Sequence, residues 1–379
     1  MRTSAHSIFA AAFIASLAAS PTSAQEIFKA GGVSFAAEIV AQGLDHPWGM
    51  DFLPGGEVLV TERSGALRIL SQVGLSDPVE GVPEVWAQGQ GGLLDVKAAP
   101  DFEQTGTVFI TFAEPGSTGA GTALARAKLV RSGADAKLEN VEVIFTMDKK
   151  SGRGQHFGSR IAFGPDGTIF LTTGDRGDGR RAQDMMDSAG AVLRINQDGS
   201  VPADNPYAAS DDALHLIWSK GHRNIQGATY DPVTEGLITV EHGAKGGDEI
   251  NLPKPGKNYG WPVISYGVNY NGSKIGSGTS AEGLEQPIFY WDPSIAPSGL
   301  AVYRGNMFPE WQGDLLVGSL KFGLLSRLDR DESGNILDEE RMLKGAFGRI
   351  RDVDVAPDGA IWLLTDESDG AIIRLSRTD

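Results

Sequence analysis

Six segments of the chain share one pattern of apolar and polar positions: a short apolar strand, a polar turn that contains proline, and a second apolar strand with a polar end. The clearest copy is SRIAFGPDGTIFLTTGD, which starts at Ser159. Short apolar runs separated by Pro, Asp and Gly are typical of β-hairpins. The other copies start at Trp48, Leu93, Gln226, Ser298 and Arg351. Each copy therefore predicts two antiparallel strands joined by a turn.

The recurrence of this hairpin predicts the architecture. Six copies give a period of about sixty residues, somewhat above the repeat lengths of roughly 40–50 residues of common propellers. An all-β, six-bladed β-propeller with four-stranded antiparallel blades fits, with each copy as the two inner strands of a blade. Further apolar segments, each with an arginine near its end, are expected as outer strands: GALRIL (65–70), AVLRIN (191–196), GLLSRL (323–328) and GAIIRL (370–375). A β-sandwich is the alternative, but it does not explain why one hairpin returns so often.

The start of the chain has the pattern of a secretory signal peptide. Arg2 precedes the apolar run IFAAAFIASLAA (8–19), and small residues lead to a cleavage site after Ala24. We therefore expect residues 1–24 to be removed and 25–379 to form a single catalytic propeller domain in a periplasmic or secreted protein. The segment VSFAAEIV (33–40) is predicted to complete the last blade and close the ring. No later run is long and apolar enough to span a bilayer, so membrane insertion is not expected.

Composition narrows the classes of function. The absence of cysteine excludes thiolate metal sites and cysteine nucleophiles. The net charge of −16, from 49 acidic and 33 basic residues, disfavours nucleic acid and anionic membranes as partners. Walker, HExxH, GxSxG and dinucleotide-binding motifs are missing, which disfavours ATP, NAD and serine-hydrolase chemistry.

Polar residues near the repeats are the candidates for a site, because the first strand of each propeller blade lines the central channel. Those that precede or begin a copy, together with one that follows a second strand, are Gln90, His156, Arg223, Asn224, Ser294, Arg349, Arg351 and Lys321.

His156 and Asp175 flank the third hairpin, which should bring them together. A carboxylate beside an imidazole holds its tautomer and raises its basicity, as a general base needs. A structural role is the common alternative for a single histidine.

Four basic residues, Arg223, Lys321, Arg349 and Arg351, are expected to converge on the axis. Surface ion pairs are the ordinary alternative for such residues. A converging cluster would instead require a polyanionic ligand to offset its charge.

The segment EHGAKGGDEINLPKPGKNYGW (241–261) is rich in glycine and carboxylates. Its carbonyls and the side chains of Glu241, Asp248 and Glu249 are oxygen ligands suited to Ca²⁺. The spacing does not match an EF-hand, so a plain turn is an equal alternative.

Taken together, HFGSRIAFGPDGTIFLTTGD, GHRNIQG, EHGAKGGDEIN followed by NYGWP, IAPSG, GSLKFG and GRIRDV resemble the soluble PQQ-dependent sugar dehydrogenases. The chain is most similar to the periplasmic aldose sugar dehydrogenase branch, and the match runs from about Gly43 to the C-terminus. The resemblance implies an enzyme that oxidises aldoses at C1 to lactones, with pyrroloquinoline quinone (PQQ) and Ca²⁺ as cofactors and an external electron acceptor.

The resemblance also implies roles for individual residues. His156 would be the general base that takes the C1 hydroxyl proton as hydride passes to the quinone, and Asp175 would orient it. Gln90 would contact the sugar beside them. The resemblance implies that Arg223 and Asn224 contact the quinone oxygens, and that Ser294, Lys321, Arg349 and Arg351 contact the cofactor carboxylates. It also implies that the carbonyls of Gly243 and Ala244 bind one Ca²⁺, and that Glu249 and the carbonyl of Tyr259 bind a second Ca²⁺.

Two differences from the family pattern affect what is expected. Ser294 stands where soluble glucose dehydrogenase has threonine, and the loops that shape the sugar site and a dimer interface are shorter. The sugar range and the choice between monomer and homodimer therefore stay open. The alternatives in function are a Ca²⁺-dependent sugar-lactone hydrolase, which should not need four basic residues at the axis, and a non-catalytic carbohydrate-binding propeller, which would not need a His–Asp pair.

Overall fold

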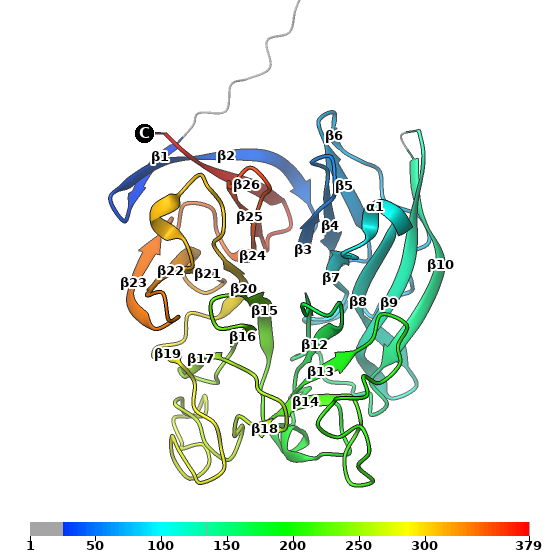
Figure 1. The fold of residues 1–379 in the computed structure, drawn as a ribbon, viewed down its shortest axis with the longest axis vertical. Helices are drawn as coiled ribbons and strands as arrows, with labels where there is room; N and C mark the ends of the chain where they lie inside the picture. Colours follow the sequence, from blue (N-terminus) through cyan, green and yellow to red (C-terminus); the bar gives the residue numbers. More distant parts are fainter. Residues whose placement is uncertain (1–25, 134, 379) are drawn as a thin grey trace, which may run out of the picture.

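The computed structural model describes residues 26–133 and 135–378, and these fold into six antiparallel-based sheets arranged in a ring (Figure 1). The first strand of each sheet lies next to the first strands of its two neighbours, so the six first strands surround a central axis. The prediction of an all-β, six-bladed propeller is confirmed. The expected signal peptide, 1–24, lies outside the described residues.

In blades one to five the strands run in chain order from the axis outward. Blade one contains β3 (Pro47–Phe52), β4 (Val58–Glu62), β5 (Leu67–Ser71) and β6 (Gly74–Leu75). Blade two contains β7 (Leu93–Ala98), β8 (Thr107–Gly116), β9 (Gly119–Ser132) and β10 (Asp135–Thr146). Blade three contains β11 (Gly158–Phe163), β12 (Ile169–Thr173), β13 (Ala191–Ile195) and β14 (Ile217–Lys220).

The second half of the ring repeats this order. Blade four contains β15 (Ile225–Asp231), β16 (Gly236–Glu241), β17 (Asp248–Asn251) and β19 (Phe289–Trp291). Blade five contains β20 (Pro297–Val302), β21 (Leu315–Ser319), β22 (Leu324–Arg330) and β23 (Ile336–Met342). Blade six contains β24 (Ile350–Val355), β25 (Ile361–Thr365) and β26 (Gly370–Arg377). The six predicted hairpins are thus the two inner strands of the six blades, and the four arginine-bearing segments are the third strands β5, β13, β22 and β26.

The ring is closed by the beginning of the described chain. Strand β2 (Val33–Leu44) pairs antiparallel with β26 as the fourth strand of blade six, which confirms the predicted closure (Figure 1). Phe35 of β2 is fully buried, and its ring lies 5.8 Å from Phe28 and 6.0 Å from Trp311. The pairing of β2 with β26 brings both ends of the described chain into one blade.

Two added strands were not predicted. β1 (Glu26–Ala30) pairs with β2 as a fifth strand of blade six, and β18 (Lys257–Asn258) pairs in parallel with β14 at the edge of blade three. The helical elements are α1 (Phe102–Thr105) and two 3₁₀ helices, η1 (Gly179–Gln183) and η2 (Pro309–Trp311). Within the described part of the chain, no helix is long and apolar enough to cross a membrane.

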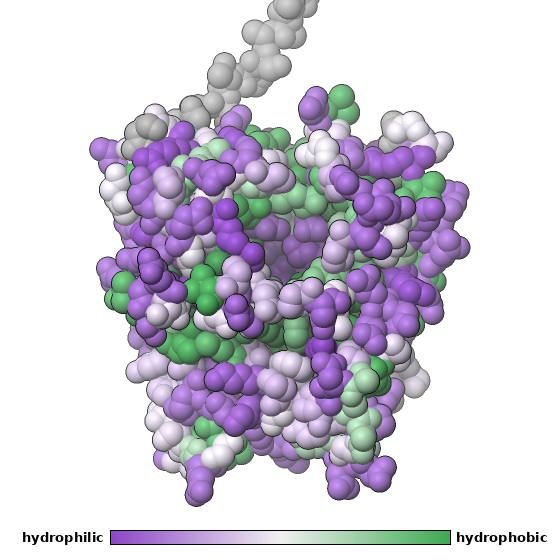
Figure 2. Space-filling view, viewed as in Figure 1, coloured by the Kyte–Doolittle hydropathy of each residue, from purple (hydrophilic) through white to green (hydrophobic). Residues whose placement is uncertain are grey.

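Apolar side chains fill the spaces between neighbouring blades. Phe109 and Leu124 of blade two, for example, pack in one cluster with Ile161 and Leu171 of blade three. Because alternate residues of each inner strand are used in this way, polar residues remain at the strand ends and along the axis. The space-filling view shows a hollow with hydrophilic side chains in the middle of the displayed face (Figure 2).

Candidate active site

His156 and Asp175 form a buried pair, as predicted from the hairpin that they flank. The imidazole Nδ1 lies 2.6 Å from Asp175 Oδ1, and the two residues are 8% and 1% exposed. Two further donors hold the carboxylate: Gly177 N at 2.7 Å and Trp261 Nε1 at 2.8 Å. No other hydrogen bond of the His156 ring is formed within the described residues, which leaves Nε2 available to accept a proton.

The local sequence explains why these two residues meet. Gly158 pairs with Thr173 at the end of the hairpin, so the residues just outside the pair face each other. A Cβ at Gly174 would come within 2.2 Å of the His156 carbonyl oxygen, so only glycine fits there. His156 itself adopts a positive φ of 57°, which turns its side chain out of the strand direction.

The surroundings of the pair keep the imidazole neutral. Burial is the largest influence and lowers the pKa of His156 below its ordinary value; the hydrogen bond to Asp175 opposes this, and the charge of Arg223 adds to it. Burial acts to raise the pKa of Asp175, but its hydrogen bonds from His156 and Gly177 outweigh burial and lower that pKa. The arrangement is therefore a neutral imidazole supported by a carboxylate, which is suited to a general base.

A cavity of about 860 Å³ lies at the axis, and its lining includes Phe157 and Gly158, which follow His156 in the chain, but neither His156 nor Asp175. Gln90, Phe157 and Gly158 line it on the side of His156, and the Gln90 side-chain oxygen accepts a hydrogen bond of 2.8 Å from His156 N. The predicted site residues that line the cavity are Gln90, Asn224, Gly243, Ala244, Ser294, Lys321, Arg349 and Arg351.

Positive side chains dominate the cavity. Within the described residues its lining includes the cations Arg63, Lys245, Lys321, Arg349 and Arg351 and the carboxylates Asp292 and Asp366. Arg349 and Arg351 share one partner, Asp366 Oδ2, at 3.1 and 2.8 Å. In a chain with a net charge of −16, this local excess of cations indicates an anionic ligand.

Ser294 is held in place by a buried carboxylate. Its hydroxyl donates to Asp248 Oδ2 at 2.7 Å, and the same carboxylate accepts from the backbone N–H groups of Gly243, Ile295 and Ala296. Asp248 thereby joins the 243–247 loop of blade four to the turn that enters blade five. The Ser294 hydroxyl proton is directed toward Asp248 rather than into the cavity.

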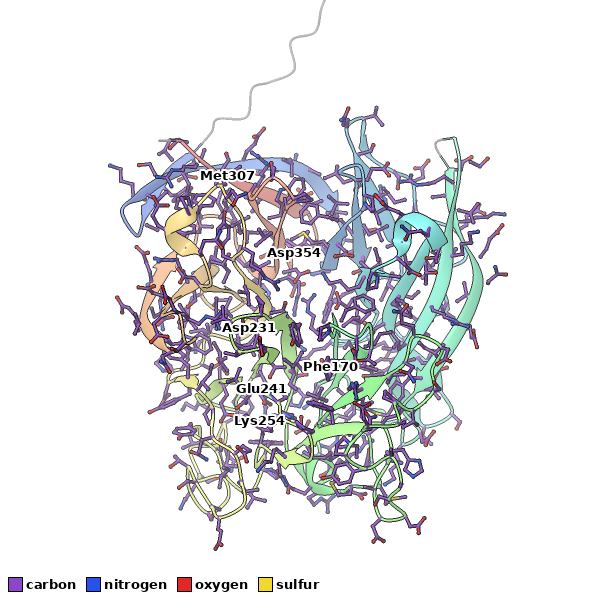
Figure 3. The ribbon with its side chains drawn as sticks, in the orientation of Figure 1. Phe170, Asp231, Glu241, Lys254, Met307 and Asp354 are labelled. Carbon is purple, nitrogen blue, oxygen red and sulfur yellow. The ribbon has the colours of Figure 1, made fainter. Side chains whose placement is uncertain are left out.

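Arg223, Glu249 and Tyr259 do not line the main cavity but a smaller one of about 20 Å³ behind it. Gly243 lines both cavities and accepts a hydrogen bond of 2.5 Å from Arg223 Nη1. Glu241, at the end of β16, also faces the small cavity and is labelled in Figure 3. The wall between the two cavities is thus the loop that begins at Gly243.

The small cavity is lined by two neighbouring carboxylates, Glu241 and Glu249, and by the cationic side chain of Arg223. Glu249 lies opposite Glu241 in the sheet register, and Asn251 Nδ2 donates to both, at 3.2 and 3.0 Å. Burial, and next the neighbouring Glu241, raise the pKa of Glu249 to about 8. Among the residues that the structure describes, no three His, Asp or Glu side chains cluster as metal ligands. A metal ion here would therefore need backbone carbonyl oxygens as well.

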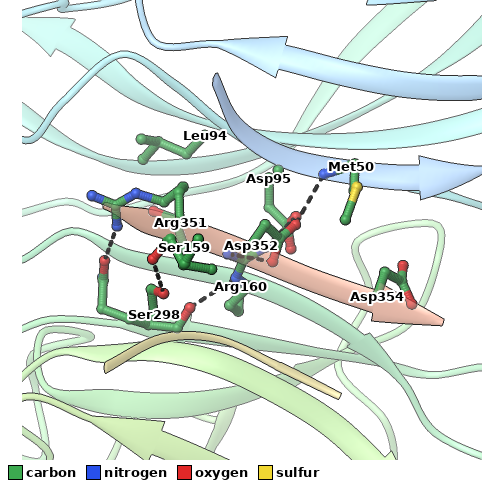
Figure 4. Close-up of polar contacts among 12 residues, drawn as sticks. Met50, Leu94, Asp95, Ser159, Arg160, Ser298, Arg351, Asp352 and Asp354 are labelled. Carbon is green, nitrogen blue, oxygen red and sulfur yellow. Dashed lines mark hydrogen bonds and ion pairs between the residues drawn. The ribbon is translucent and has the colours of Figure 1, made fainter. Parts of the chain in front are cut away.

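An ion-paired cluster fills the axis beside the cavity (Figure 4). Arg160 Nη1 lies 3.1 Å from Asp95, and Arg160 Nη2 lies 2.9 Å from Asp352. Trp48 lines the cavity with its ring 4.2 Å from the Arg160 guanidinium and 5.9 Å from that of Arg351. Stacking on Trp48 helps to hold both guanidinium groups in place.

Some site residues were missed although the repeat pattern could have found them. Trp48 begins the first hairpin copy, as His156 precedes the third. Asp366 follows the second strand of the sixth copy, as Asp175 follows that of the third. Arg63 follows the second strand of the first copy. Lys245 and Asp292 lie in loops and gave no comparable signal.

The fold and the site together define a six-bladed β-propeller with an axial cavity rich in cationic side chains and a buried His–Asp pair. The family model described as "Glucose / Sorbosone dehydrogenase" matches residues 44–374. The chain belongs to this family, whose members are oxidoreductases acting on CH–OH groups of sugars.

Relatives of the chain are also named as sugar dehydrogenases. An aldose sugar dehydrogenase of Escherichia coli, YliI, is 41% identical over 89% of this chain and 92% of its own. Quinoprotein glucose dehydrogenase B of Acinetobacter calcoaceticus is 28% identical over 91% of this chain and 88% of its own. The structure of a PQQ-bound aldose sugar dehydrogenase from Streptomyces coelicolor superimposes with a TM-score of 0.74 at 28% identity, covering 91% of this chain and 98% of that one.

Proposed function

We propose that the protein oxidises aldoses at C1 to lactones with PQQ, and that His156 is the general base. The observation that carries the proposal is the buried His156–Asp175 pair beside a cavity rich in cations. The relatives support it, since one is named a quinoprotein and the structure of another contains PQQ.

The residues of the cavity fit PQQ. The cofactor is a tricarboxylate, and within the described residues the cavity lining has more cationic side chains than carboxylates. Lys321, Arg349 and Arg351 would hold the cofactor carboxylates. We assign Ser294 to fixing the turn before β20 through Asp248, because that carboxylate receives its only hydroxyl proton.

Bound PQQ would supply the hydride acceptor for C1 of the sugar. His156 would take the C1 hydroxyl proton at Nε2, because Nδ1 faces Asp175. Asn224 lies in the cavity wall with Oδ1 accepting from Gly158 N at 3.2 Å, which leaves its Nδ2 donors for the ligand. Gln90 would bind the sugar, and Asp175 would act through the imidazole.

Arg223 is placed to act from behind the cavity wall. Its Nη1 group donates to Gly243 O, its guanidinium lies 5.2 Å from the Trp261 ring, and its buried Nε has no partner within the described residues. A donor left unpaired in this way would suit an oxygen acceptor on the ligand. We propose that Arg223 polarises a quinone oxygen of the bound cofactor.

Ca²⁺ is the second proposed cofactor. Gly243 and Ala244 line the main cavity, next to where the cofactor would sit, and their carbonyl oxygens would bind the first Ca²⁺. Glu249 and the carbonyl of Tyr259 would hold another Ca²⁺ in the small cavity, where a cation would offset the repulsion between Glu249 and Glu241.

The test uses purified protein incubated with PQQ and Ca²⁺ and assayed with several aldoses and an artificial electron-accepting dye. We expect dye reduction that requires both the sugar and PQQ, with a lactone as product. Absence of cofactor-dependent reduction with every sugar would rule out the proposal. Hydrolysis of an added lactone without dye reduction would indicate the hydrolase alternative, and sugar binding without either reaction the non-catalytic one.

A further inference from the structure

Arg63 is a cation of the main cavity without a charged partner. It follows β4 at the end of blade one and lines the cavity. Within the described residues its side chain makes one hydrogen bond, from Nη1 to the carbonyl oxygen of Gly89 at 3.1 Å, and no carboxylate lies within ion-pair distance. Its Nε is buried and has no acceptor. A guanidinium with unused donors at a cavity wall is suited to a planar anion.

Backbone contacts place Arg63 next to the segment that carries Gln90, the residue proposed to bind the sugar. Leu93 N donates to the Arg63 carbonyl, and a Cβ at Gly92 would come within 2.0 Å of that same oxygen. The end of β4 therefore packs directly on the segment that enters blade two. That segment carries Gly89, which Arg63 binds, and Gln90, which binds His156 N.

Cations other than Arg63 are the proposed partners of the cofactor carboxylates. Arg349 and Arg351 approach the cavity from blade six and share Asp366, and Lys321 approaches from blade five. Arg63 instead binds Gly89, the chain neighbour of Gln90, and the Gln90 side chain accepts a hydrogen bond from His156 N. The charge of Arg63 is thus close to the substrate's position.

We propose that Arg63 recognises a carboxylate on the substrate, so that the aldoses this protein takes include uronic acids. Such a sugar would present its anomeric carbon to His156 and its C6 carboxylate to Arg63. The inference rests on the proposed function, because it places the sugar beside Gln90 and His156.

The test measures binding without turnover. Methyl β-glucuronide and methyl β-glucoside have a blocked anomeric oxygen, so neither can be oxidised at C1. Their dissociation constants for protein loaded with PQQ and Ca²⁺ would be measured by calorimetry. We expect the glucuronide to bind about tenfold or more tightly than the glucoside, as a charge-assisted hydrogen bond predicts.

Three variants locate the source of this preference. Arg63→Gln should abolish the preference for the glucuronide, and Arg63→Lys should restore part of it. Lys245→Gln removes another unpaired cation of the same cavity and should keep most of the preference. An equal loss in Lys245→Gln would show that overall cavity charge, rather than Arg63, attracts the anion, and would overturn the assignment.

Two further results would contradict it. Equal affinity of the unsubstituted protein for both glycosides would do so, as would a loss of PQQ affinity in Arg63→Gln, which would make Arg63 a cofactor ligand. Oxidation of glucose with PQQ, assayed in parallel, separates failure of this inference from failure of the proposed function.

Discussion

Replacing Asp175 by Asn should slow the reaction by about 10- to 100-fold without weakening cofactor binding. Three donors converge on this carboxylate, at 2.6 Å from His156, 2.7 Å from Gly177 and 2.8 Å from Trp261. An asparagine can offer one oxygen only, so its amide NH₂ must face either the imidazole or the indole N–H. Loss of a hydrogen bond to a charged group costs about 1.5–3 kcal/mol, which gives the expected factor in kcat.

The pH profile of the same variant gives a second test, because the direction in which the acid limb moves is also predicted. Neutral His156 is the active form, so kcat should fall as the pH drops through its pKa, which lies below the ordinary value. The Asp175 hydrogen bond raises that pKa, so its removal should move the acid limb of the profile to still lower pH. A merely disordered site would not produce this shift.

Steady-state kinetics with PQQ, Ca²⁺ and a saturating dye would measure both effects. Asp178→Asn is the matched control, because Asp178 lies on the same loop and binds Arg180 rather than His156. The control should stay within about twofold of the unsubstituted protein, as expected of an exposed ion pair. A kcat for Asp175→Asn within threefold of the parent, or an acid limb displaced to higher pH, would refute the reasoning.

Other predictions concern the cofactors and the fold. The double substitution Arg349→Gln with Arg351→Gln should weaken PQQ binding by about 100-fold or more in calorimetry, because two charge-assisted contacts are lost; unchanged affinity would remove these residues from the carboxylate site. Glu249→Gln should raise the melting temperature of metal-free protein at pH 7, because it removes a carboxyl whose ionised form is disfavoured by burial and next by Glu241, and it should abolish the rise caused by Ca²⁺; a retained Ca²⁺ effect would count against this ligand. Phe35→Ala should destabilise the protein by about 3–5 kcal/mol in urea unfolding, since the ring is fully buried where β2 closes the propeller; a loss below about 1 kcal/mol would contradict that packing.

The sequence predicted the blades because the signal for each one is local. A strand, a turn with Pro, and a second strand identify an inner hairpin from fewer than about 25 consecutive residues. Closure by β2 was also predicted, since a four-stranded blade six lacked an outer strand. Strand β1 was missed although Gly31 and Gly32, both at positive φ, form a two-residue hairpin turn between Ala30 and Val33. Strand β18 could not be predicted, because Asn258 reaches Lys220 from a distant loop.

The site was predicted where side chains follow the repeat, and less well where loops decide their direction. His156 meets Asp175 because a hairpin brings its two ends together. The division into two cavities could not be predicted, since it depends on how the 243–247 loop folds back. That fold is set by Asp248, which accepts from Gly243 N, and by Arg223, which donates to Gly243 O. No sequence pattern predicts these contacts.

The most direct test of the central claim is a single reductive half-reaction. Protein loaded with one equivalent of PQQ would be mixed anaerobically with an aldose in the absence of acceptor, while the spectrum of the oxidised cofactor is followed in a stopped-flow instrument. We predict full reduction with release of one lactone per protein, and no comparable reduction in His156→Ala, which should still bind PQQ. A cofactor spectrum unchanged by every aldose, or a His156→Ala variant that reduces PQQ as fast as the unsubstituted protein, would contradict the account.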